Sequence, residues 1–62
     1  MRYIIYDPDS ELYFSKIENV YIEFIDWPED AMLFNTYEEA SDMCHKIAEM
    51  DKDIEHLIVE EA

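Results

Sequence analysis

The chain has 62 residues, about the smallest size at which a domain folds on its own hydrophobic core, so residues 1–62 have room for a single domain. Half of the residues are hydrophobic and 15% are aromatic, which excludes a disordered acidic tail. Its 17 carboxylates against four basic residues give a formal charge of −13, which excludes direct binding to nucleic acid and attraction to anionic lipid.

The first half of the chain has the pattern of a β-meander. Aromatic and β-branched residues alternate with turn-forming sequences, of which Asp7-Pro8-Asp9-Ser10 is the first. We expect strands at residues 2–6, 11–16 and 20–25. Trp27-Pro28 ends the third strand, because proline has no N–H to donate to a central ladder. Residues 31–34 are expected to approach the next element in an extended conformation.

A helix is predicted to begin at Tyr37. Thr36 and Glu39 match a capping box, in which each side chain accepts a hydrogen bond from the backbone N–H of the other residue. Apolar residues then recur at three- and four-residue steps and form one stripe: Ala40, Met43, Cys44, Ile47 and Met50. Asp51-Lys52-Asp53 should end the helix, and residues 54–60 should form a last strand.

These elements predict an α+β fold in the order β-β-β-α-β, a small antiparallel sheet with one amphipathic helix packed on one face. The chain contains no glycine, so positive φ angles are expected at residues that tolerate them. The candidates are Asn19, Asn35 and Asp53.

Both faces of the sheet carry apolar side chains. Because side chains alternate along a strand, Val20, Ile22 and Phe24 share the face that we expect in the core. A single helix covers only one face, so we expect Tyr13, Tyr21 and Ile25 to be exposed on the other face. That face also carries one tyrosine of residues 2–6. This face is a candidate for binding a partner or a second copy of the chain. The alternative is a half-wet sheet surface without a partner.

Carboxylates gather on the exposed side of the predicted helix and just before it. They are Glu29, Asp30, Glu38, Glu39, Asp42, Glu49 and Asp51. On a rigid helix, carboxylates present negative charge at spacings comparable to the roughly 7 Å between phosphates of one strand, so a basic nucleic-acid groove could accept them. The alternative is an ordinary solvated helix face.

No constellation predicts catalysis, a metal ion or a cofactor. Asp7, Asp9 and Glu11 alternate like the start of a calcium loop, but Leu12 stands where such a loop needs glycine. Cys44 and His45 are neighbours on the predicted helix and point about 100° apart, which disfavours a shared zinc ion. Glycine-rich phosphate loops and nucleophilic serine motifs are absent from the sequence.

The environment expected for the chain is a reducing cytoplasm. Its single cysteine, Cys44, cannot form an internal disulfide, and the first residues lack the charged and apolar regions of a secretory signal. Apolar runs are only a few residues long, far short of the roughly 20 that span a bilayer, so no membrane segment is expected.

Residues 30–40, DAMLFNTYEEA, resemble the D-A-x-x-F-x-T/S-x-E-E-A segment of small uncharacterised acidic phage and prophage proteins. The resemblance covers about a sixth of the chain. It implies a short sheet before the segment, a helix that starts at the threonine and a strand after it. It also implies a role in host takeover or counter-defence, because small acidic phage proteins commonly inhibit nucleases, CRISPR effectors or restriction enzymes.

The sequence therefore favours an acidic inhibitor that occupies a basic, nucleic-acid-binding surface of a host or defence protein. An alternative is an interaction module, as a homodimer or an antitoxin-like partner, that binds through the tyrosine-rich sheet face. A third class, an enzyme or metal protein, would have to use Cys44, His45 and His56.

Overall fold

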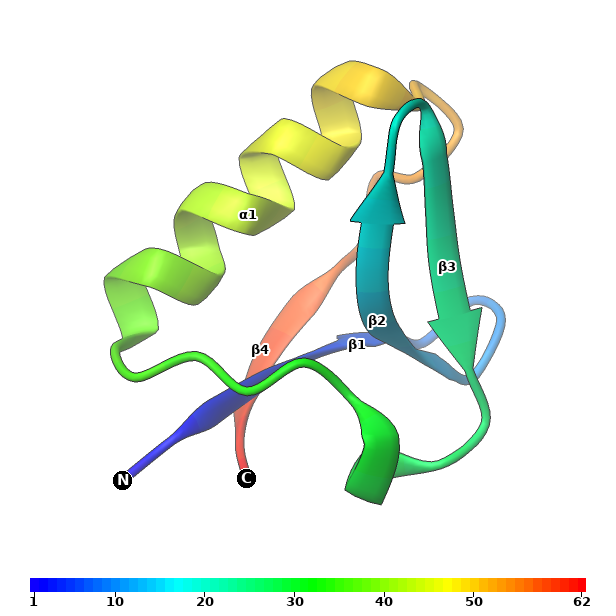
Figure 1. Cartoon of the computed structure of the whole chain (residues 1–62). Coiled ribbons are helices and arrows are strands. Elements are labelled where there is room, and N and C mark those ends of the chain that lie inside the picture. Colours follow the sequence, from blue (N-terminus) through cyan, green and yellow to red (C-terminus); the bar gives the residue numbers. More distant parts are fainter.

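The computed structural model describes residues 1–62 as one small sheet with a helix packed across it (Figure 1). The elements are β1 (Tyr3–Asp7), β2 (Leu12–Glu18), β3 (Tyr21–Ile25), the 3-10 turn η1 (Pro28–Asp30), α1 (Tyr37–Met50) and β4 (Ile58–Glu61). The predicted α+β class and the order β-β-β-α-β are confirmed. No helix in the structure has the length and apolar character needed to cross a membrane.

The sheet has the strand order β3-β2-β1-β4, and every neighbouring pair is antiparallel. The last strand therefore lies beside the first, which brings the two chain ends together (Figure 1). Their contact is a hydrogen bond in which the Ala62 N–H donates to the Arg2 carbonyl over 2.8 Å. β3 and β4 form the two edges of the sheet.

A bulge in β2 bends the sheet around the helix. The register between β2 and β3 shifts between Phe14 and Lys16, and such an extra residue increases the local twist of a strand. Beyond the bulge, β2 no longer follows β1, and the segment before α1 takes its place. There Tyr3 and Phe34 exchange both backbone hydrogen bonds, over 2.9 and 2.8 Å, so the predicted extended approach to the helix is confirmed at this residue.

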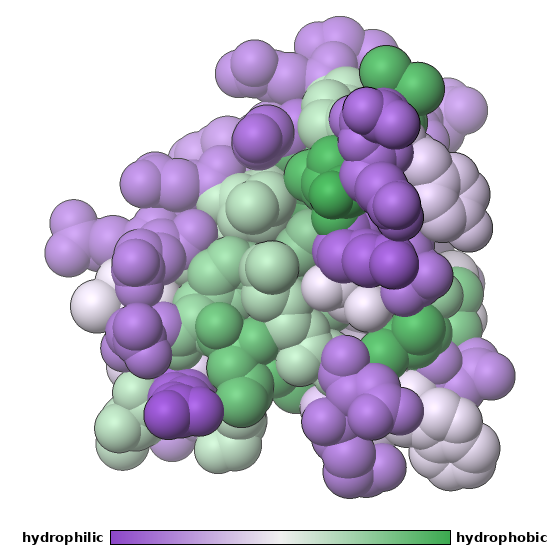
Figure 2. Space-filling model, viewed as in Figure 1, coloured by the Kyte–Doolittle hydropathy of each residue, from purple (hydrophilic) through white to green (hydrophobic).

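The hydrophobic core lies between α1 and one face of the sheet. Its buried members come from β1, β2, the segment before the helix, and the helix itself: Ile5, Phe14, Phe34, Ala40 and Ile47. Met43 and Cys44 of the predicted helix stripe pack against this core, while Met50 is 38% exposed at the end of the helix. Figure 2 shows apolar residues gathered between helix and strands, and hydrophilic residues over the outer side of α1.

The predicted capping box is present at the start of α1. The Glu39 N–H donates to Thr36 Oγ1 over 3.1 Å, and the Thr36 N–H donates to Glu39 Oε1 over 3.1 Å. The helix ends at Met50, immediately before Asp51, as the sequence predicts. These contacts satisfy two backbone donors that the first turn of a helix otherwise leaves without a partner.

Two predictions about strands are wrong. Val20 does not belong to the core face: it lies in the two-residue turn between the paired residues Glu18 and Tyr21, and is 91% exposed. The last strand begins at Ile58 and not at residue 54, because Ile58 pairs with Tyr6, near the point where β1 gives way to its turn. Upstream residues have no ladder partner there, although Ile54 and Leu57 still pack on the core.

The prediction for positive φ angles is correct at one position. Asn19 has a φ of 57° in the β2–β3 turn, but Asn35 and Asp53 do not adopt positive φ, and Glu11 does, with a φ of 61°. Glu11 closes the β1–β2 turn, where its N–H donates to the Asp7 carbonyl over 2.8 Å. That turn determines the conformation of Glu11 despite its long side chain.

Candidate protein-binding surfaces

One row of side chains crosses the sheet face that α1 leaves uncovered. Ile58 pairs with Tyr6, Tyr6 with Tyr13, and Tyr13 with Ile25. Residues directly opposite each other on antiparallel strands project from the same face, so the row contains one residue from every strand. The rings of Tyr6 and Tyr13 pack against each other, with their centroids 4.9 Å apart and their planes tilted by 44°.

This outer row is less exposed than the sequence predicts. Tyr6, Tyr13 and Ile25 are half-buried, because neighbours in the row cover one another, and only Ile58 at the edge is 43% exposed. Tyr21 is 62% exposed, but it lies at the other end of β3, roughly 13 Å from Ile25 along the strand. The structure thus brings Tyr13 and Ile25 together with Tyr6 and Ile58, and leaves Tyr21 apart.

Carboxylates flank the outer row. Glu23 and Glu60 lie two residues from Ile25 and Ile58 on the same strands, so they project from the same face, and both are half-buried. Neither forms an ion pair. Partial burial raises the pKa of the Tyr6 phenol above its ordinary value, and the charge of Glu11 raises it further, with smaller contributions from Tyr13, Glu60 and Asp7.

The outer side of α1 carries an acidic stripe, formed by Glu38, Asp42 and Glu49. These residues lie four and seven positions apart, on the side of the helix opposite the buried Ile47, and all are exposed. The stripe spans roughly 16 Å along the helix axis. His45 lies beside the stripe, on the flank of α1 that faces β4 together with Cys44. No basic side chain forms an ion pair with any of the stripe's three carboxylates.

The other predicted acidic residues do not join this stripe. The Glu39 carboxylate accepts the hydrogen bond from the Thr36 N–H in the capping box, and Asp51 accepts one from the Asp53 N–H over 3.0 Å. Glu29 and Asp30 are exposed in η1, which lies apart from α1 (Figure 1). The carboxylates predicted on the helix and those predicted just before it therefore lie on two separate parts of the surface.

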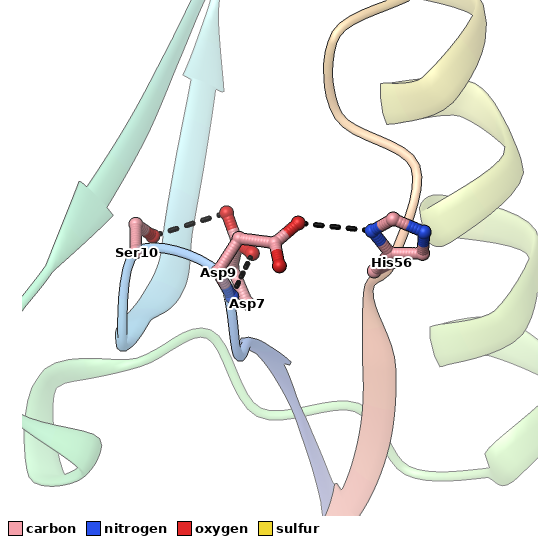
Figure 3. Close-up of polar contacts among 4 residues, drawn as sticks. All are labelled: Asp7, Asp9, Ser10 and His56. Carbon is pink, nitrogen blue, oxygen red and sulfur yellow. Dashed lines mark hydrogen bonds and ion pairs between the residues drawn. The ribbon is translucent and has the colours of Figure 1, made fainter.

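The carboxylates of the β1–β2 turn have partners within the protein (Figure 3). Asp7 accepts hydrogen bonds from the Asp9 N–H and the Ser10 hydroxyl, each over 3.0 Å. Asp9 Oδ2 lies 2.9 Å from His56 Nδ1, and this hydrogen bond and the Asp9 charge raise the pKa of His56. The residues that resemble a calcium loop thus shape a turn and attach it to the segment before β4. No three His, Cys, Asp or Glu side chains are grouped so that they could hold a metal ion.

A groove between α1 and β4 was not expected from the sequence. It has a volume of about 470 Å³, and the helix side is lined by Tyr37, Cys44 and Ala48. Leu57, Ile58 and Val59 line the opposite side. Burial raises the pKa of the Cys44 thiol, so this cysteine behaves as an apolar wall residue. The only signal in the sequence is the small residues Ser41 and Ala48, seven positions apart beside the apolar stripe.

Comparisons with protein-family models, with curated proteins and with solved structures found no match to this chain.

Proposed function

We propose that this chain binds a basic protein surface, as an inhibitor that occupies a nucleic-acid-binding surface of a host or defence protein. The proposal rests on the observation that almost none of the carboxylates forms an ion pair with a basic side chain of the chain itself. Lys16 and Glu18 form the only ion pair of a lysine or arginine, over 3.4 Å, and both side chains are exposed. The second pair, between His56 and Asp9, is charged only when His56 is protonated. The formal charge of −13 is therefore available to attract a basic partner.

The acidic stripe is the part of this surface best suited to a nucleic-acid-binding groove. Along the helix axis Glu38 and Asp42 are roughly 6 Å apart, close to the spacing of phosphates on one strand. α1 holds them on a capped, packed helix, so binding does not first have to order the backbone. Complementary charge also accelerates encounter with a basic partner.

The proposed setting is the cytoplasm of an infected or lysogenic cell. It rests on the resemblance of residues 30–40 to phage and prophage proteins and on the single cysteine. A partner from a defence system fits a small acidic chain, because nucleases and related effectors use basic surfaces to hold their substrates.

A second candidate function is a non-mimic interaction module, in which the outer row binds an apolar partner surface or a second copy of the chain. The row Ile58–Tyr6–Tyr13–Ile25 favours it, since aromatic side chains at the centre of a face that no helix covers are typical anchors of interfaces. Association through the row should persist at high salt, whereas binding led by charge should weaken.

The experiment compares two variants of equal charge. One replaces the acidic stripe (Glu38→Gln, Asp42→Asn, Glu49→Gln), and the other replaces carboxylates around η1 (Asp26→Asn, Glu29→Gln, Asp30→Asn). Immobilised chain and variants are exposed to lysate at low salt, and bound proteins are eluted with a salt gradient and identified by mass spectrometry.

Under the proposal, basic nucleic-acid-binding proteins elute from the unmodified chain and from the η1 variant, and the stripe variant loses them. Retention by all three proteins, or elution that is independent of salt, contradicts the proposal. Loss of retention in a Tyr13→Ser variant, together with dimers in sedimentation, supports the second candidate instead.

A further inference from the structure

β4 has a free backbone edge. It pairs only with β1, and the Ala62 N–H donates to the Arg2 carbonyl on that side. Backbone groups alternate in direction along an antiparallel strand, so Glu60 and Ile58 also face β1. Val59 and Glu61 therefore direct their N–H and C=O groups away from the sheet. An additional strand could pair with these groups.

Sheet edges are commonly protected by a short strand, charged side chains, proline or a bulge. β4 has four residues and ends in Glu60 and Glu61, whose charge opposes an acidic strand but not a cationic one. It contains no proline, and its register with β1 is regular. The other edge, β3, runs instead into Trp27 and Pro28.

The groove adjoins this edge. The flank of α1 that carries Tyr37, Cys44 and Ala48 faces the strand across it, and Leu57 and Val59 line the strand side. Side chains of an added strand would alternate, one set entering this groove, whose lining is mostly apolar but includes Ser41, His45 and Glu55, and the other lying on the outer face beside the exposed Ile58. The edge therefore offers both backbone pairing and side-chain burial.

The carboxylates around the groove indicate which kind of segment binds there. Glu55 lines the groove, and Glu60 and Glu61 form the end of β4, with no lysine or arginine among the lining residues. A second copy pairing through β4 would bring two such carboxylate pairs together between chains that each carry −13, and like charges on paired strands are destabilising. A cationic strand has the opposite effect.

We propose that β4 and the α1 groove bind an extended, cationic segment of a protein partner, which adds to the sheet as a fifth strand. Apolar side chains of the segment enter the groove, and the lysine or arginine side chains that alternate with them lie on the outer face beside Glu60. The inference rests on the proposed function in that the partner is basic, and it adds a second contact beside the acidic stripe.

The test uses a pool of randomised octapeptides passed over the immobilised full chain, with sequencing of those retained. Two variants separate backbone pairing from charge. Glu61→Pro removes the outward N–H together with one carboxylate, and Glu61→Gln removes the carboxylate alone. Circular dichroism and urea unfolding first establish that both variants fold. Hydrogen exchange of the Val59 and Glu61 amides, measured on the unmodified chain, gives a readout that needs no variant.

Under the inference, retained peptides alternate apolar and basic residues and slow the exchange of the Val59 and Glu61 amides. Glu61→Pro weakens their binding about tenfold, whereas Glu61→Gln weakens it about threefold or less. The acidic-stripe variant binds the peptides as the unmodified chain does.

No retained peptide, retained peptides without basic residues, unchanged exchange at both amides, or equal weakening by the two Glu61 variants overturns the inference. The proposed function fails separately, by retention of lysate partners on the acidic-stripe variant. A failure of the groove therefore remains distinguishable from a failure of charge-led binding.

Discussion

Glu11 holds a backbone conformation that suits glycine, at a φ of 61°. The left-handed region costs a residue with a Cβ roughly 1–2 kcal/mol, and glycine in the unfolded chain gives back part of that difference. We predict that Glu11→Gly raises the free energy of unfolding by about 0.5–1 kcal/mol. Urea denaturation followed by tryptophan fluorescence measures the change.

Two controls belong to this substitution. Glu11→Gln removes the carboxylate but keeps the Cβ, so it separates relief of charge repulsion from relief of backbone strain. Asn19→Gly should change stability little, because asparagine tolerates a positive φ better than glutamate. An equal gain from Glu11→Gln and Glu11→Gly would show that backbone strain is not the cause.

His56 gives the fold a dependence on pH near neutrality. Its hydrogen bond with Asp9 raises the pKa of the folded state above the 6.5 of free histidine. The stabilisation is therefore fully present below pH 6.5 and is lost as the pH rises through the raised pKa of the folded chain. We predict that His56→Gln removes this decline, measured as urea midpoints from about pH 5.5 to 8.5.

Asp9→Asn is the matched control for the pair, because it keeps the histidine and removes the charge that raises the pKa of His56. It should flatten the same part of the stability profile. Parallel profiles for the unmodified chain and both variants would mean that this contact contributes nothing in solution.

Single residues were the hardest level to predict. Val20 and Tyr21 are both typical of strands, so the sequence placed them together, yet the two-residue turn excludes Val20. The Glu11 side chain has no feature that favours a positive φ. The hydrogen bond that closes the β1–β2 turn imposes this angle. Asp9 and His56 lie 47 positions apart in the sequence, and no local pattern predicts their contact.

The start of α1 depends on the capping box. Loss of the Thr36 hydroxyl leaves the Glu39 N–H without its partner. We predict that Thr36→Ala lowers the free energy of unfolding by about 1 kcal/mol and speeds amide exchange in the first turn. Thr36→Ser keeps the acceptor and should retain most of the stability. If alanine and serine behave alike, the cap contributes no stability.

At the scale of elements, the helix and the first three strands could be predicted because their signals are local. The capping box, the stripe of apolar residues and the turn sequences lie within a few positions of the boundaries that they determine. Sheet order is different. The place of β4 beside β1 depends on how α1 crosses the sheet, which no local pattern states. For the same reason the groove between α1 and β4 was missed.

The whole molecule carries a formal charge of −13 within 62 residues, so its carboxylates repel one another in the folded state. Salt screens this repulsion, with a Debye length of about 8 Å at physiological ionic strength. We predict that added sodium chloride raises the melting temperature, measured by circular dichroism. The acidic-stripe variant should melt higher than the unmodified chain at low salt and gain less from added salt. A flat or falling melting temperature would contradict this prediction.

For the candidate surfaces, the residue types could be predicted from the sequence, but the positions of those residues relative to one another could not. Charge and tyrosine content indicated an acidic helix face and an aromatic sheet face, and the structure places the acidic stripe and the outer row on different sides of the molecule. The register of the strands decides which tyrosines meet, so Tyr6 joins Tyr13 while Tyr21 stands apart. The separation of Glu29 and Asp30 from α1 likewise follows from the path of the chain through η1.

The most direct test of the central claim is competition for the partner's nucleic-acid-binding surface. A basic protein recovered from lysate is loaded with a fluorescently labelled duplex or single strand, and the chain is titrated in while fluorescence anisotropy is measured. We predict that the unmodified chain releases the nucleic acid and that the acidic-stripe variant, at the same concentrations, does not. A stable ternary complex, in which chain and nucleic acid bind the partner together, would contradict it.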